Sequence, residues 1–367
     1  MSSVLSSLNP NLAHLPVYQP GRPIEEVARE YQLPVESILK VASNENPLGP
    51  SPKAVAAMRA VLDHLHLYPD GNAFYLKRKL AQKLGVAPEN LILGNGSNEI
   101  IEFVGHALMK PGIDVVVSEY CFAVYPIITH LFGANLVTVP AQKLGHDLPA
   151  MLQAITPQTK VLFVANPNNP TGTIAPKKQI FEFVEKVPDS VLLVMDEAYV
   201  EFLSDPADLL AFIRQGAKSN LLIMRTFSKI YGLAGLRLGY GIAHPLLISA
   251  MEKVRQPFNI NSLIQAGALA ALDDDEHLRR TRENNRAGLR FFTEELGRLK
   301  LESIPSEANF VLVRVGDGHQ VFERMQRTGV ITRPMGGYKL PEWIRITIGT
   351  SQENERCLAA LKNALTS

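Results

Sequence analysis

The run RTFSKIYGLAGLRLGYG, residues 225–241, places an amine, two hydroxyls and a second cation close together. Lys229 follows the apolar run 221–224 and a hydroxyl-rich turn, where scarce water would favour the neutral amine that forms a Schiff base with an aldehyde. Thr226 and Ser228 can donate hydrogen bonds to phosphate oxygens, and Arg237 can bind the same dianion. An aldehyde cofactor that carries a phosphate is pyridoxal phosphate, so the run predicts a covalent anchor for that cofactor. The alternative is a surface lysine in a glycine-rich loop.

Polar residues also follow two other apolar runs. Asn169, in ANPNNPTG, comes soon after residues 161–164, and its amide can bond a phenolic oxygen. Asp196 directly follows residues 191–195, and a carboxylate at the end of a buried strand needs a partner. A protonated pyridine nitrogen would be such a partner and would keep the ring an electron sink, while Tyr199 could bond the phenolate oxygen. Alternatively, Asp196 is only a helix N-cap.

A glycine-rich turn, GNGSNEIIEF, predicts an anion site at a helix start. Gly94 and Gly96 allow a tight turn after the apolar run 91–93, and Ser97, Asn98 and Glu99 open a helix. The free N–H groups and positive end of that helix would face a phosphate. The same sequence is also compatible with a strand-to-helix turn that binds no ligand.

Five further side chains carry groups that could take part in binding or catalysis. Phe122, in EYCFAVY, could stack on a pyridine ring or be a core phenylalanine. Arg345 lies in an apolar strand, where it needs a carboxylate, a phosphate or a structural ion-pair partner. Tyr68, in LYPDG, offers a phenol of undetermined direction. His64 and the histidine two residues later have no third ligand at suitable spacing, so we expect surface histidines and no metal site.

The elements that must position these residues alternate between strands and helices. Because the strand runs are continuously apolar, they predict a mostly parallel central sheet covered by helices on both faces, an α/β fold. In such sheets, ligands collect beyond the carboxyl ends of the strands, where the polar motifs fall. The strands are expected at 91–93, 115–117, 136–139, 161–164, 191–195, 221–224 and 238–242.

The two ends of the chain differ from this pattern. Residues 1–46 are rich in proline and polar residues, with a helix near 24–31, and predict an N-terminal arm that also forms part of the small domain. Residues 47–258 are expected to form the large cofactor domain. Residues 259–367 predict a smaller α+β domain, in which DDDEHLRR begins a charged helix, strands lie at 309–313 and 343–348, and a helix closes the chain.

Composition narrows the partners. A formal net charge of +1 argues against a broad basic surface for nucleic acid, so small molecules and other copies of the chain are expected. Cys121 and Cys357 are far apart and form no C-x-x-C motif, which favours a reducing cytoplasm. No signal-peptide pattern and no apolar run near 18 residues occurs, so no membrane association is expected.

Taken together, these motifs resemble the fold-type I pyridoxal-phosphate aminotransferases, and within them the branch that acts on histidinol phosphate. The resemblance covers nearly the whole chain, and the order and spacing of the motifs are more specific than any one of them. Its motifs are NENPLGPSP, LYPDG, GNGSNE, NPNNPTG, DEAYVEF, RTFSKIYGLAGLRLGY, PFNIN and WIRITIGT.

The resemblance implies a role for each site residue. Lys229 would be the catalytic residue and the covalent anchor. Residues of the cofactor site would be Ser97, Asn98, Glu99, Phe122, Asn169, Asp196, Tyr199, Thr226, Ser228 and Arg237, with Tyr68 reaching across from a second subunit of a homodimer. Residues of the substrate site would be Tyr18, Asn44, Arg333 and Arg345, with Arg345 on the carboxylate of glutamate and Tyr18 and Arg333 on the substrate phosphate.

The implied reaction is reversible amino transfer between L-histidinol phosphate and 2-oxoglutarate, giving imidazole-acetol phosphate and L-glutamate in histidine biosynthesis. Two departures from the family pattern stand out: Phe122 where a tyrosine is common, and Asn98 where an acidic residue is frequent. Stacking survives the first change, although a hydroxyl contact is lost. Alternatives are an aromatic amino acid aminotransferase, a decarboxylase of phosphorylated amino acids, or a cofactor-sensing binding protein.

Overall fold

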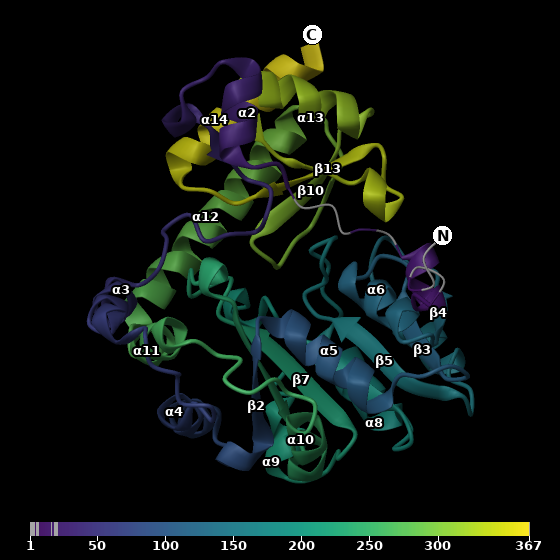
Figure 1. Ribbon diagram of the computed structural model, residues 1–367. Helices are drawn as coiled ribbons and strands as arrows, with labels where there is room; N and C mark the ends of the chain where they lie inside the picture. The colour runs from purple at the N-terminus through teal and green to yellow at the C-terminus, as the bar shows by residue number, and fades with distance from the viewer. Residues whose placement is uncertain (1–3, 5–6, 16, 18–20, 367) are drawn as a thin grey trace.

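A computed structural model describes residues 4, 7–15, 17 and 21–366 of the chain (Figure 1). Its largest sheet has seven strands in the order β2-β8-β7-β6-β5-β3-β4. The strands are β2 (Leu91–Asn95), β3 (Asp114–Ser118), β4 (Asn135–Val139), β5 (Thr159–Ala165), β6 (Leu192–Asp196), β7 (Leu221–Thr226) and β8 (Leu238–Ala243). All seven predicted runs form strands of this sheet. Only β8 runs against the others, pairing antiparallel with both β2 and β7, an exception that the apolar runs did not indicate.

Helices cover both faces of this sheet, which explains why its strands are apolar at consecutive positions. In β5, Val161 and Phe163 pack on one face, whereas Leu162 and Val164 pack on the other. The first face is covered by α5 (Ser97–Leu108), α6 (Val124–Leu131) and α10 (Pro245–Glu252). The second is covered by α4 (Phe74–Leu84), α7 (Leu148–Gln153), α8 (Lys177–Lys186), α9 (Leu210–Arg214) and α11 (Ser262–Ala271).

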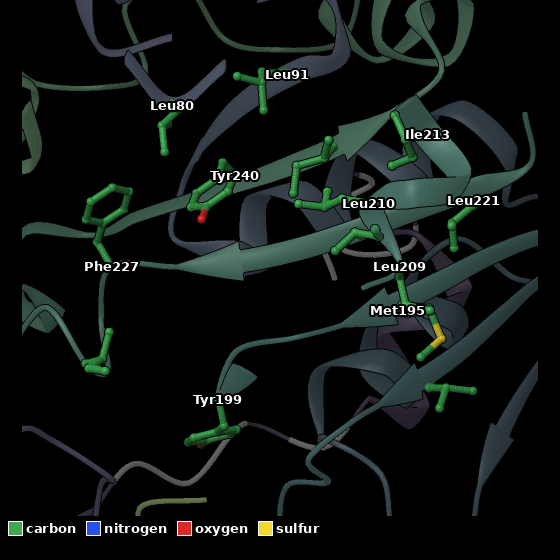
Figure 2. Packing of buried hydrophobic residues seen from close by; sticks show 14 of the residues in the cluster. Leu80, Leu91, Met195, Tyr199, Leu209, Leu210, Ile213, Leu221, Phe227 and Tyr240 are labelled. Atoms are coloured by element: carbon green, nitrogen blue, oxygen red, sulfur yellow. The ribbon is translucent and has the colours of Figure 1, made fainter. Parts of the chain in front are cut away.

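Figure 2 shows part of the core on the second face. Leu91, Met195, Leu221 and Tyr240 come from four different strands and lie on the same side of the sheet. Tyr199 belongs to the same core but follows the end of β6. This core therefore continues past the carboxyl ends of the strands, where the cavity described below opens.

A second, smaller sheet is antiparallel and has the order β12-β13-β10-β9. Its strands are β9 (Ser303–Ile304), β10 (Phe310–Arg314), β12 (Arg333–Pro334) and β13 (Trp343–Thr347), and its helices are α13 (Gly318–Arg327) and α14 (Ser351–Thr366). The long helix α12 (Asp275–Arg298) links the two parts, since Leu278 packs in the core of the larger sheet and Phe292 in that of the smaller (Figure 1).

The N-terminal residues contact both parts. The 3₁₀ helix η1 (Pro10–His14) lies against α6, where Asn11 donates a hydrogen bond to the Leu131 carbonyl at 3.3 Å. The predicted helix at 24–31 forms α2 (Ile24–Tyr31), whose Val27 packs with Ile331. β1 (Leu39–Lys40) then pairs in parallel with β11 (Val330–Ile331).

The mostly parallel, two-sided α/β sheet with a smaller α+β part is confirmed. The division at residues 46 and 258 stays a proposal, and α11, which follows residue 258, packs Ile264 and Ala268 into the core of the larger sheet. Helix α3 (Pro52–Arg59) packs on α11.

Candidate active site

A cavity of about 360 Å³ lies where β5, β6 and β7 end, and the start of α5 also lines it. The smaller sheet contributes Arg333 and Arg345 to its lining, so the cavity lies between the two sheets. Most of the predicted residues meet here, although they are spread over three hundred positions of sequence. The predicted residues that line it are Asn44, Ser97, Asn98, Phe122, Asn169, Asp196, Tyr199, Thr226, Ser228, Lys229, Arg237, Arg333 and Arg345.

Lys229 is half-buried in the turn after β7 and reaches into this cavity. Its Nζ donates a hydrogen bond to the Ser43 carbonyl at 3.2 Å and lies 5.8 Å from the centre of the Tyr199 ring. Burial lowers the pKa of Lys229 to about 8, and the nearby positive charge of Arg345 acts in the same direction. A substantial neutral fraction near neutral pH is what an amine needs to act as a nucleophile or a base.

Asp196 ends β6 and is 6 % exposed. Its Oδ2 accepts a hydrogen bond from the Tyr125 hydroxyl at 2.6 Å, and its Oδ1 accepts one from the Ala198 N–H at 3.1 Å. Burial raises the pKa of Asp196, whereas these two hydrogen bonds and the charge of Lys229 oppose that rise. A buried carboxylate held in this way is suited to pair with a cation in the cavity.

Tyr199 and Asn169 provide a phenol and an amide that both line the cavity. Tyr199 accepts a hydrogen bond from the Asn44 side chain at 2.8 Å, and burial raises its pKa to about 12. It therefore stays a hydroxyl donor at physiological pH. Asn169 Oδ1 accepts a hydrogen bond from Arg345 at 2.7 Å, which orients the amide nitrogen as a second donor.

The start of α5 forms a cradle with the turn after β7. Ser97 and Asn98 occupy the first turn of α5, whose N-terminal N–H groups and dipole favour an anion. The Arg237 guanidinium donates to Ser228 at 3.5 Å and lies so close to Gly96 that a side chain there would collide with it. Gly96 also has φ +79°, so the predicted glycine turn is confirmed.

This donor set fits pyridoxal phosphate. The first turn of α5, with Ser228 and Arg237, suits a phosphate dianion, whereas Asp196 suits a protonated ring nitrogen. Lys229 provides an amine of lowered pKa for the aldehyde, and Tyr199 provides a hydroxyl donor for the phenolic oxygen.

Three predicted residues are not among those that line the cavity. Glu99 is two positions after Ser97 on α5, about 200° around the helix, and its carboxylate instead accepts bonds from Asn95 N–H and Asn259 at 2.6 and 2.7 Å. Tyr68 is 83 % exposed and stacks on Phe258 at 4.8 Å, so its role across a subunit boundary stays a prediction. Tyr18 lies outside the described residues.

Two aromatic residues of the site were missed from the sequence. Tyr125 contacts Asp196 from α6, and its only signal in the sequence was its position three residues after Phe122, which lies just before that helix. Tyr338 lines the cavity from η7 (Gly336–Tyr338). The paired glycines before Tyr338 signalled a turn but not its direction.

Within the described part of the chain, no three His, Cys, Asp or Glu side chains gather as a metal site would require. Among those same residues, none of the helices is both long enough and apolar enough to cross a membrane.

Known proteins match the chain along nearly its full length. The family model "aminotransferase class I and II" matches residues 36–361. A histidinol-phosphate aminotransferase of Akkermansia muciniphila is 50 % identical over 99 % of this chain and 100 % of that protein. Histidinol-phosphate aminotransferase 2 of Ralstonia nicotianae is 52 % identical over 95 % of this chain and 94 % of that protein. The crystal structure of histidinol-phosphate aminotransferase from Sinorhizobium meliloti in complex with pyridoxal-5'-phosphate superposes with a TM-score of 0.89, at 29 % identity and 99 % coverage of both chains.

Proposed function

The chain belongs to the class I and II aminotransferase family, and we propose that it transfers an amino group between L-histidinol phosphate and 2-oxoglutarate. The products are imidazole-acetol phosphate and L-glutamate, and the cofactor is pyridoxal phosphate. The observation that carries this proposal is one cavity in which Lys229, Asp196 and the start of α5 meet Arg333 and Arg345. Two arginines suit substrates that bear a phosphate or a second carboxylate.

When bound, pyridoxal phosphate supplies an electron-withdrawing ring that stabilises the negative charge left at the substrate α-carbon and carries the amino group between the two substrates. Ser97, Ser228, Thr226 and Arg237 would hold its phosphate, and Asp196 would hold its ring nitrogen.

Lys229 anchors the cofactor and then moves a proton at the substrate α-carbon as base and acid, a role that its lowered pKa favours. Phe122 and Tyr199 would fix the plane and the phenolic oxygen of the ring. Arg345, which Asn169 and the Ala42 carbonyl orient, would bind the substrate carboxylate, while Arg333 would bind the substrate phosphate.

The first test is the absorbance of the cofactor-loaded protein during addition of L-histidinol phosphate, with L-phenylalanine as the comparison. The proposal is supported if low concentrations of histidinol phosphate, but not of phenylalanine, remove the absorbance band of bound pyridoxal phosphate. An equal or stronger response to phenylalanine would reassign the enzyme to aromatic amino acids. The Lys229→Ala variant should lose multiple turnover, because it has neither anchor nor base at that position.

We further propose a homodimer whose sites are shared. Large apolar side chains in the segment 62–75 are exposed, including Leu67, Tyr68 and Tyr75, and such a patch on a globular chain indicates an interface. We also propose a cytoplasmic location, which is supported by the two buried free thiols, Cys121 and Cys357.

Mixing the Lys229→Ala and Tyr68→Ala variants tests the shared site. If Tyr68 acts across the interface, equal amounts of Lys229→Ala and Tyr68→Ala chains that exchange subunits regain about a quarter of the wild-type sites, because half of the dimers are hybrids with one intact site each. If Tyr68 acts within its own chain, or not at all at the site, mixing restores nothing beyond the activity of the separate variants.

A further inference from the structure

The hydroxyl of Tyr125 donates a hydrogen bond to Asp196, the carboxylate that would pair with the cofactor ring in the proposed function. We propose that Tyr125 is a positioning residue that keeps Asp196 ionised and aimed at the ring nitrogen, an inference that rests on the proposed function. Its hydrogen bond of 2.6 Å is directed from a neutral phenol to a carboxylate oxygen. Bonds of this charge-assisted kind are short and about twice as strong as neutral ones.

The geometry of Tyr125 leaves its hydroxyl little freedom. The side chain is fully buried on α6, and its ring stacks on Phe163 of β5 with centroids 4.4 Å apart and planes 8° apart. Phe122, from the same turn of chain, meets it edge-on at 5.7 Å. Since the Ala198 N–H holds the other carboxylate oxygen, both oxygens of Asp196 are fixed by the protein itself.

The charges around Asp196 explain why it needs this donor. Burial raises the pKa of Asp196, and among the opposing interactions the Tyr125 hydrogen bond is larger than the Ala198 hydrogen bond or the charge of Lys229. Glu197, the adjacent carboxyl, is buried as well and interacts with Asp196. The remaining titratable neighbours, Tyr199 and Cys121, have pKa values of about 12 and are neutral.

Tyr125 itself stays protonated, so the direction of its hydrogen bond is fixed. Burial, followed by the charge of Asp196, raises its pKa well above the usual value for tyrosine. Without its hydroxyl, a proton shared between Asp196 and the cofactor would move toward the carboxylate: the bond from nitrogen to hydrogen breaks and an O–H bond forms on Asp196. The ring would then lose the positive charge that makes it an electron sink.

The test is Tyr125→Phe, which keeps the ring stack and removes one hydroxyl. The readout is the ¹⁵N NMR shift of the ring nitrogen in protein loaded with ¹⁵N-labelled pyridoxal phosphate, titrated with pH. The midpoint for loss of the ring-nitrogen proton should fall by about one unit or more, as expected for a hydrogen bond to a charged group. We expect kcat to fall about tenfold or more with KM little changed. Losing the hydroxyl weakens the ring as an electron sink for the negative charge at the substrate α-carbon, whereas the groups that bind the substrate are unchanged.

Tyr240→Phe is the matched control, since Tyr240 is also buried, at 2 % exposure, but packs in the core on the opposite face of the sheet. It should leave the ¹⁵N midpoint at the wild-type value. Should Tyr125→Phe fail to fold, Phe163→Leu removes the stacking partner instead and should lower the midpoint in the same direction.

An unchanged midpoint in folded Tyr125→Phe, or in Phe163→Leu when that variant stands in for it, overturns the role of Tyr125. So does an equal fall in Tyr240→Phe. Failure of the proposed function gives a different result: wild-type protein would not retain the labelled cofactor, or its ring nitrogen would be unprotonated at neutral pH before any substitution.

Discussion

The lowered pKa of Lys229 makes a quantitative prediction about cofactor loading. With a pKa of about 8 instead of the usual 10.5, about one amine in ten is neutral at pH 7, against about one in three thousand for an ordinary lysine. Only the neutral amine attacks an aldehyde. The rate at which the cofactor-free protein captures pyridoxal phosphate should therefore rise about tenfold between pH 7 and pH 9 and level off above that.

Two substitutions of opposite charge test the cause of that pKa. The positive charge of Arg345 lowers the pKa of Lys229, and the negative charge of Glu45 raises it. Arg345→Gln should therefore move the midpoint of capture to higher pH and slow capture at pH 7. Glu45→Gln should move it to lower pH, by less, because Glu45 is exposed and its charge is screened by salt.

The assay is stopped-flow absorbance of the cofactor band after mixing with excess pyridoxal phosphate, from pH 6 to pH 11. A small lysine derivative run in parallel corrects for titration of the cofactor itself. A wild-type midpoint close to 10.5 would refute the argument that burial sets the pKa of Lys229. Shifts of the same sign in both variants would refute the assignment to these two charges.

Three further substitutions concern the scaffold of the site. Gly96→Ala should weaken cofactor binding and lower stability by about 1–3 kcal/mol, because a side chain at φ +79° would displace Arg237; equilibrium dialysis and urea unfolding measure the two effects. Arg225→Met should cost about 3–5 kcal/mol in urea unfolding by leaving the buried Glu197 without the partner now 2.8 Å away, and a further change of Glu197 to Leu should recover most of that loss. Leu361→Ala, in the core of the smaller sheet, should cost about 2–5 kcal/mol and leave the midpoint of cofactor capture unchanged; a shifted midpoint would show that this core influences the pKa of the anchor.

The sequence by itself determined the strands and the chemistry of the anchor. Runs such as 161–164 and 221–224 are apolar at every position because helices cover both faces of the sheet, so composition reveals them. Lys229, with hydroxyls before it and Arg237 after it, is a local pattern, since all its members lie within residues 226–237, from the end of β7 to the start of β8. Such short-range groups are fixed by the chain itself, and the structure places them together.

Tertiary structure decided what the groups from distant segments do. The partner of Asp196 is a phenol 71 positions earlier, and Arg345 meets Asn169 across 176 positions, separations at which no local pattern gives direction. The side-chain direction of Glu99 follows from the phase of α5, which aims that carboxylate at Asn259. The pKa of Lys229 likewise depends on burial and on charges brought by other elements. The direction of each side chain, its burial and the charges near it are set only when the two sheets come together around one cavity. Each of these is a property of the surroundings of a residue and not of its type.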